Sequence, residues 1–186
     1  MQQGDKAPLM LLAELNKKGN QYDYVNLGLP NQDQISGAFI YNKERVRPYA
    51  EWLSAYSAVT SHYHTRLIAQ GFELLDKNGQ PTGKKLIVNV NHFKSKRAGR
   101  QAYSTHMRRL ANTDSLLIML PKAVERFEDS DVILLGDYNC YTQETPIQKI
   151  VRAGYADMLQ AFCAQDYSYN YKGLVGYLDS CFASPS

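Results

Sequence analysis

The pattern of apolar and polar positions predicts a mixed α/β domain whose strands are mostly antiparallel. Helical spacing of apolar residues occurs at 9–15 and over 101–127, where Pro121 is expected to bend or divide the helix. Alternating or continuous apolar runs predict the strands. The expected strands are 22–25, 35–41, 45–49, 65–75, 84–92, 132–135, 167–171 and 177–184, and shorter helices are expected at 146–153 and 157–162.

Turn residues predict two hairpins. The segment 42–44 joins the second and third expected strands, and 76–79, with its Asn-Gly dipeptide, joins the fourth and fifth. The residues before the fourth strand fit either helix or loop and end in His62 and His64. Two histidines at this spacing could share a metal on a strand, although a solvated polar loop explains them better.

One strand end carries candidate chemistry. Four apolar residues, 132–135, are followed by Gly136 and then by Asp137 and Asn139, which would point the same way on an extended strand. Adjacent oxygen donors suit a hard cation such as Mg²⁺, or a phosphate under attack by water. The same letters also fit an ordinary polar turn, because Asp and Asn are both turn residues.

Basic residues are densest over 94–100, immediately after His92 at the end of an apolar strand. Charge runs of this kind usually form a solvated loop. A strand-end histidine beside a cationic loop also suits contact with phosphate, so both interpretations stay open.

Composition limits the protein class without choosing a substrate. The 186 residues are 44% hydrophobic and 21% charged, as expected of one globular domain. The net charge of +3 permits a polyanionic partner, and 14 tyrosines offer surfaces that can stack. Three cysteines (Cys140, Cys163, Cys181) allow one disulfide at most, and neither a signal peptide nor a membrane-spanning run occurs in this chain.

Several short motifs together resemble one family. They are NHFKSK at 91–96, GDYNCYTQETPI at 136–147, GYADML at 154–159 and YSYNYKGLVGYLDSCFAS at 167–184, with GAFIY at 37–41 and HTRLIAQGF at 64–72. Their order and spacing resemble the endonuclease/exonuclease/phosphatase superfamily with the deoxyribonuclease-I-like fold, and most of all its bacterial, often secreted, nuclease branch. The resemblance implies a four-layer α/β/β/α sandwich over 1–186, a Mg²⁺- or Mn²⁺-dependent phosphodiesterase acting on nucleic acid, and a secreted or periplasmic location.

The resemblance also implies roles for particular residues. Asp137 would position or activate the attacking water, Asn139 would hold the scissile phosphate or the metal-bound water, and His92 would contact the phosphate. Both Asp137 and Asn139 would lie at the metal. Asp157 is similar to the carboxylate that orients a catalytic histidine in this family, and Asp179 to a supporting strand residue beside the site.

Four basic residues are expected to bind substrate: Arg66, Lys94, Lys96 and Arg97.

The chain departs from the family pattern at both ends. The family's metal-binding Glu and its final Ser-Asp-His motif have no counterpart in 1–186, and Ser180 stands where the secreted branch often has His. We therefore expect an incomplete domain that binds metal weakly, has little activity alone and can self-associate through uncovered sheet edges. The alternative is a non-catalytic remnant or binding module of the same fold.

Overall fold

The computed structural model of the chain describes residues 6–27, 37–55, 67–96, 102–163 and 167–185. A six-stranded sheet forms its centre, in the order β3-β4-β5-β6-β10-β7. The strands are β3 (Val46–Ser54), β4 (Leu67–Leu75), β5 (Pro81–His92), β6 (Val132–Asp137), β7 (Ala156–Asp157) and β10 (Asp179–Ala183). Only β5 and β6 pair in parallel, and every other neighbouring pair in this sheet is antiparallel.

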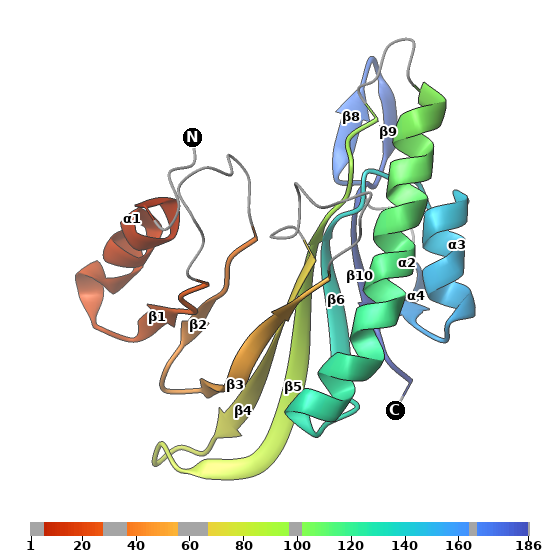
Figure 1. Cartoon of the computed structure of the whole chain (residues 1–186). Helices are drawn as coiled ribbons and strands as arrows, with labels where there is room; N and C mark the ends of the chain where they lie inside the picture. The colour runs from red at the N-terminus through yellow and green to blue at the C-terminus, as the bar shows by residue number, and fades with distance from the viewer. Residues whose placement is uncertain (1–5, 28–36, 56–66, 97–101, 164–166, 186) are drawn as a thin grey trace.

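Two helices cover one face of the sheet (Figure 1). The long helix α2 (Ala102–Phe127) connects β5 to β6, because parallel neighbours need a crossover, and α3 (Thr145–Arg152) lies beside it. The larger apolar core lies under these helices and includes Leu116, Leu120 and Phe127, all buried. Burial of this face therefore fixes where β6 and its polar end come to lie.

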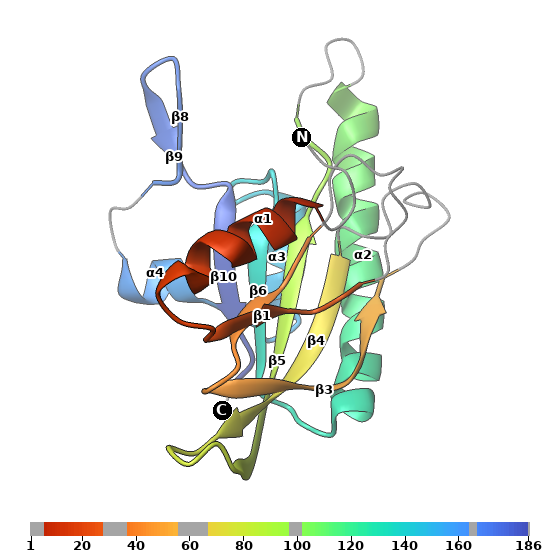
Figure 2. The same ribbon diagram turned by 90° about the vertical axis from the view of Figure 1, so that its left-hand side faces the viewer.

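A second layer lies on the other face of the sheet. It consists of the two-stranded β1 (Tyr22–Tyr24) and β2 (Ile40–Asn42), with α1 (Lys6–Leu15) and a 3₁₀ turn, η1 (Asn16–Lys18), outside it (Figure 2). A smaller apolar cluster joins the layers: Val25, Leu27 and Phe39 pack with Ile68 and Phe72 of β4. The layers follow the predicted α/β/β/α order, which confirms the expected fold class.

The remaining elements lie beside β10 or beyond its end. The short helix α4 (Met158–Phe162) follows β7, and β8 (Tyr169–Tyr171) pairs with β9 (Leu174–Gly176) in a hairpin that projects beyond β10 (Figure 2).

One local prediction was wrong, and a second was wrong in one of its two alternatives. The expected hairpin through 42–44 does not form, because β2 pairs with β1 while β3 pairs with β4, so the turn carries the chain from one layer to the other. Pro121 does not divide the helix, since α2 continues through it. The hairpin of β4 and β5 is confirmed, with the turn at 76–79 between them.

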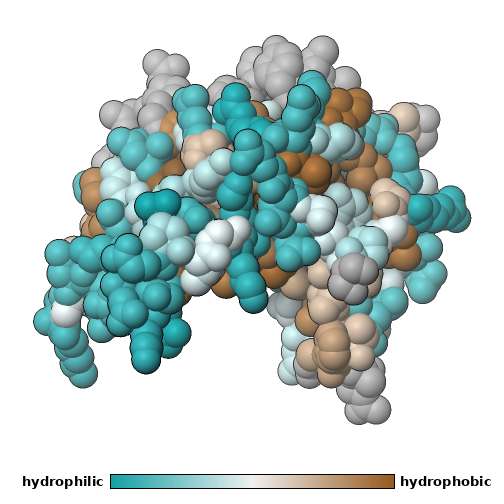
Figure 3. All heavy atoms as spheres, turned by 90° about the horizontal axis from the view of Figure 1, so that it is seen from below, coloured by the Kyte–Doolittle hydropathy of each residue, from teal (hydrophilic) through white to brown (hydrophobic). Residues whose placement is uncertain are grey.

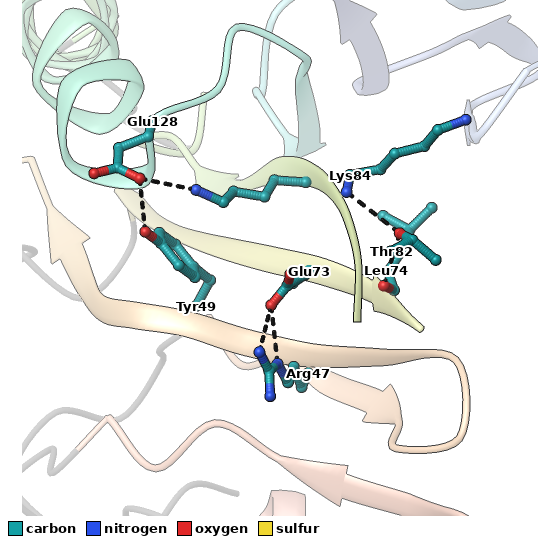
Figure 4. A network of polar contacts seen from close by, with 8 residues as sticks. Arg47, Tyr49, Glu73, Leu74, Thr82, Lys84 and Glu128 are labelled. Atoms are coloured by element: carbon teal, nitrogen blue, oxygen red, sulfur yellow. Dashed lines mark hydrogen bonds and ion pairs between the residues drawn. The ribbon is translucent and has the colours of Figure 1, made fainter. Parts of the chain in front are cut away.

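The end of the sheet near the β4–β5 turn is held by surface polar contacts (Figure 4). Arg47 Nε and Nη2 both donate to Glu73 Oε2, at 2.9 and 2.7 Å. Glu128, just after α2, accepts from Tyr49 Oη and Lys85 Nζ at 2.7 and 3.0 Å. The Glu128 contacts tie the end of α2 to β3 and β5, and the Arg47–Glu73 contacts join β3 to β4. Seen from below, this end of the molecule is mostly hydrophilic, with smaller apolar areas (Figure 3).

Cys140, Cys163 and Cys181 form no disulfide with one another, and burial raises the pKa of the Cys140 thiol to about 12. Within the described residues, no helix combines the length and apolar character needed to span a membrane.

Candidate active site

His92, Asp137 and Asp179 lie next to one another where three neighbouring strands meet one end of the sheet. His92 is the register partner of Asp137 in the parallel β5–β6 pair, and Asp179 is its partner in the antiparallel β6–β10 pair. Residues directly opposite one another share a face of the sheet. His92 Nε2 lies 3.9 Å from Asp137 Oδ2. The structure thus places an imidazole and two carboxylates in a strand-end row.

Gly136 brings β6 close enough to β5 for this row to form. Its φ of 143° is a conformation that residues with a side chain rarely adopt, and a Cβ built there would lie 1.9 Å from Asn91 O. The glycine of the predicted motif is therefore required by backbone approach, one residue before the candidate catalytic carboxylate.

Asp137 and Asn139 are joined by a turn rather than by strand alternation. The strand β6 ends at Asp137, and Asn139 adopts a left-handed φ of 50°. Its backbone N–H donates to Asp137 Oδ1 at 2.8 Å, and its side-chain Nδ2 donates to Phe93 O at 3.1 Å. The expected extended geometry was wrong, yet the two residues are in direct contact, and Asn139 is buried.

The pKa of Asp137 is raised above its ordinary value. Burial is the largest cause, and the nearby Asp179 carboxylate acts in the same direction. The Asn139 N–H and the His92 imidazole oppose the shift without cancelling it. A carboxylate with a raised pKa is a better proton acceptor, which suits the predicted role of Asp137 with an attacking water.

A buried polar network supports the row from the α2 side. Asn91 Nδ2 lies within hydrogen-bond distance of three acceptors: Tyr138 Oη at 2.9 Å, Leu135 O at 3.2 Å and Asn89 Oδ1 at 2.5 Å. Asn89 Nδ2 donates to Ile68 O. The Tyr138 ring is fully buried. We did not predict this network, although two asparagines alternating with apolar residues in β5 were a visible signal.

Lys96 belongs to a charged cluster around Glu144. Its Nζ forms an ion pair with Glu144 Oε1 and lies 4.0 Å from the centre of the Tyr141 ring. Arg109 Nη2, on α2, lies 3.9 Å from Glu144 Oε2. Burial raises the pKa of Glu144, but Lys96, the Tyr141 N–H and Arg109 outweigh it, so the pKa is lowered. The cluster contains two cations, Lys96 and Arg109, and one carboxylate, Glu144, so its net charge is positive.

Arg109 and Glu144 were not predicted as site residues, since helical spacing explained the first and a turn signature the second. Of the other predicted substrate-binding residues, Lys94 is half-buried, its N–H donating to Asn112 and its carbonyl accepting from Arg109. Arg66 and Arg97 lie outside the described residues, as do His62 and His64.

Asp157 lies away from the row. It pairs with Phe182, three positions along β10 from Asp179. Its Oδ1 caps α4 by accepting from Leu159 N and Gln160 N, at 3.0 and 3.2 Å, and its Oδ2 accepts from Tyr177 Oη at 3.2 Å. In the structure Asp157 is a helix cap, and its histidine-orienting role stays a prediction.

The residues of the row meet the needs of a metal ion only in part. The described residues contain no group of three or more His, Cys, Asp or Glu side chains that could hold one. Asp137 and Asp179 are nevertheless two carboxylates on adjacent strands, and Mg²⁺ usually combines one or two carboxylates with water and substrate phosphate.

Solved structures whose chains superimpose on this one identify the fold. The chain superimposes on the human Nocturnin catalytic domain with bound sulfate (TM-score 0.62, 18% identity, 96% of this chain and 64% of that one). It also matches a mannosyl-6-phosphatase of Bacteroides thetaiotaomicron (0.60, 17%, 96% and 68%) and D. rerio TDP2 with single-strand DNA product (0.59, 19%, 96% and 67%). The chain thus shares the fold of these structures, and it also matches the fold of a Bacteroides thetaiotaomicron protein that is described as belonging to the endonuclease/exonuclease/phosphatase family. At this level of identity the likeness establishes the fold and leaves the chemistry to the residues of this chain.

The chain spans about two thirds of the length of each of these three structures. No protein-family model and no curated protein sequence matches it. One of these structures is named a mannosyl-6-phosphatase and another holds a single-strand DNA product, so the shared fold alone does not choose among phosphate esters.

Proposed function

We propose that this chain carries the central part of the active site of a phosphodiesterase that hydrolyses nucleic acid. The observation that carries the proposal is the strand-end row, in which Asp137 lies between His92 and Asp179. The positive cluster of Lys96 and Arg109 around Glu144 lies on the segments that extend from the same strand ends and would attract a phosphate backbone.

Each residue of the site has a proposed role that follows from its contacts. Asp137, with its raised pKa, would accept a proton from the attacking water. His92, beside it, would donate to a phosphoryl oxygen when protonated. The Asn139 amide donates to Phe93 and its side chain also bonds to Asp137, which leaves its oxygen for a metal-bound water.

A divalent cation, Mg²⁺ or Mn²⁺, would be held by Asp137 with Asn139, and Asp179 is close enough along the row to contribute charge. When bound, such an ion stabilises charge that develops on the phosphoryl oxygens. Because the described residues offer few oxygen ligands at the row, we propose that further ligands come from residues outside the described ranges. A secreted or periplasmic location likewise stays a prediction.

A plasmid-nicking assay tests the proposal. The purified chain with Mn²⁺ or Mg²⁺ should show trace, chelator-sensitive nicking that Asp137→Asn abolishes. The matched control is Asp131→Asn, which changes an exposed carboxylate just before the other end of β6 and should leave the trace activity intact. Equal loss in both variants would contradict the role of Asp137, and robust cleavage by the unmodified chain would contradict weak metal binding.

The second candidate is a non-catalytic binding module of the same fold. The observation that favours it is the lack, among the described residues, of a group of three metal-ligating side chains. In that case the chain would bind nucleic acid with the salt dependence of a basic surface and show no metal-dependent nicking at all.

A further inference from the structure

Among the tyrosines whose burial the structure describes, the most exposed ones gather in one place. Tyr141, Tyr167 and Tyr169 are 42, 60 and 40% exposed. The other tyrosines whose burial the structure describes are buried or half-buried. All three exposed rings belong to the β8–β9 hairpin, to the residues leading into it, or to the loop after β6. An exposed aromatic ring forgoes the free energy of burial, so three in one area require an explanation.

Two of these tyrosines lie on the same side of the hairpin. Tyr169 is the register partner of Gly176, so the two positions share a face. A Cβ built on Gly176 would lie 2.8 Å from Tyr141 Cε1, which places the Tyr141 ring against that same face. The glycine thus makes room for one ring beside the other, and Tyr167 is two residues before Tyr169. We call Tyr141, Tyr167 and Tyr169 the tyrosine strip.

The tyrosine strip is tied to the strand-end row by short connections. Ser168, between two of its members, accepts at Oγ from the backbone N–H of Leu178 and of Asp179, at 3.1 and 3.2 Å. Tyr141 follows Asp137 by four residues, and its backbone N–H is held by Glu144 at 2.8 Å. The rings are therefore presented on backbone that is anchored to residues of the site.

A cation lies directly on the strip. Lys96 Nζ is 4.0 Å from the centre of the Tyr141 ring and is also paired with Glu144. Proteins that bind single-stranded nucleic acid without reading its sequence combine two features. Aromatic rings stack on the bases, and neighbouring cations contact the phosphate backbone. A paired duplex keeps its bases stacked on each other and cannot use such rings.

We propose that the tyrosine strip is a stacking platform for unpaired bases next to the phosphate in the strand-end row, which makes single-stranded nucleic acid, or an unpaired end, the ligand of this site. The proposal rests on the proposed function, because that function places a phosphate in the strand-end row. Its test does not depend on that function, because base stacking is measured as binding, without hydrolysis. Loss of one stacked base by substitution of an aromatic residue typically lowers affinity by about tenfold.

The test compares oligonucleotides that carry the same charge. Binding of the full chain to a short oligothymidylate and to an abasic oligomer of equal length is measured with chelator present. We expect the oligothymidylate to bind about tenfold more tightly, and Tyr169→Leu or Tyr141→Leu to remove most of that difference. Tyr169→Phe keeps the ring and should retain it. The matched control is Phe162→Leu, since Phe162 is an aromatic residue on α4 with 77% exposure and should not affect binding.

Equal affinity for the two oligomers, or an equal effect of Phe162→Leu, would overturn the proposal. An oligothymidylate preference that survives both tyrosine-to-leucine changes would overturn it as well. Failure of the proposed function is a separate result: nicking that does not depend on Asp137 would contradict that function while leaving the base preference as measured.

Discussion

Asp137 of β6 and Asp179 of β10 lie directly opposite each other in the antiparallel register, at one end of the six-stranded sheet. Like charges at opposed positions destabilise a sheet. The pair is nevertheless formed, and burial together with the Asp179 carboxylate raises the pKa of Asp137. A pair that costs stability and perturbs a pKa is typical of a functional site.

The first prediction concerns stability and pH. The folded protein holds the pKa of Asp137 above its value in the unfolded chain, so the protonated carboxyl favours the folded state. This contribution to stability is complete below the ordinary carboxyl pKa. It is lost as the pH rises through the raised pKa of the folded protein. Asp137→Asn should therefore unfold at higher urea concentration than the parent at neutral pH. The difference should shrink as the pH approaches the ordinary carboxyl pKa.

Asp179→Asn tests the cause of that shift. Removing the neighbouring charge should lower the pKa of Asp137, which carboxyl-carbon NMR titration measures directly. An unchanged pKa would show that burial accounts for the whole shift.

The second prediction concerns Gly136. Gly136→Ala should destabilise the chain by about 3 kcal/mol or more, because it combines an unfavourable φ with a direct clash against the β5 backbone. Gly79→Ala is the matched control: its φ of 75° is also left-handed, but nothing lies within 4 Å of the added Cβ. That change should cost about 1 kcal/mol. Similar urea midpoints for the two variants would contradict the close approach of β6 to β5.

The third prediction concerns the charged cluster. Glu144→Gln removes the carboxylate that pairs with Lys96 and Arg109, so it should tighten binding to nucleic acid and steepen its salt dependence. Lys94→Ala with Lys96→Ala should do the opposite, lowering the slope of log affinity against log salt by about 1 for each phosphate that is no longer neutralised. Fluorescence anisotropy over a salt series measures both. An unchanged slope in Glu144→Gln would mean that the two cations do not reach phosphate.

The fourth prediction concerns α1, which has no buried residue. Leu9, Met10, Leu11 and Leu15 are 46, 60, 53 and 41% exposed, so the helix presents an uncovered apolar surface. We expect the isolated chain to self-associate, and Leu11→Glu to reduce this association in sedimentation velocity. Lys17→Glu, in the adjoining η1 turn, should not. A strictly monomeric parent chain would contradict this expectation and no other.

Local sequence determined the elements that depend on neighbours along the chain. The Asn-Gly turn between β4 and β5, the helical spacing of α2 and the apolar run of β6 all predicted what forms, because turn geometry and periodicity are properties of a short segment. The motifs around Asp137 also indicated the fold class, and strand-end placement indicated which polar residues to inspect.

Partners distant in sequence were decided only by the tertiary structure. Nothing in 35–49 shows that β2 leaves β3 to pair with β1, because either pairing satisfies the same alternation of apolar residues. The opposition of Asp137 and Asp179 depends on the register of β10, which burial of Phe182 and Leu134 sets. The Glu144 cluster and the tyrosine strip likewise exist only once α2 and the hairpin have docked, since a charge or a ring acquires its neighbours from packing rather than from its place in the chain.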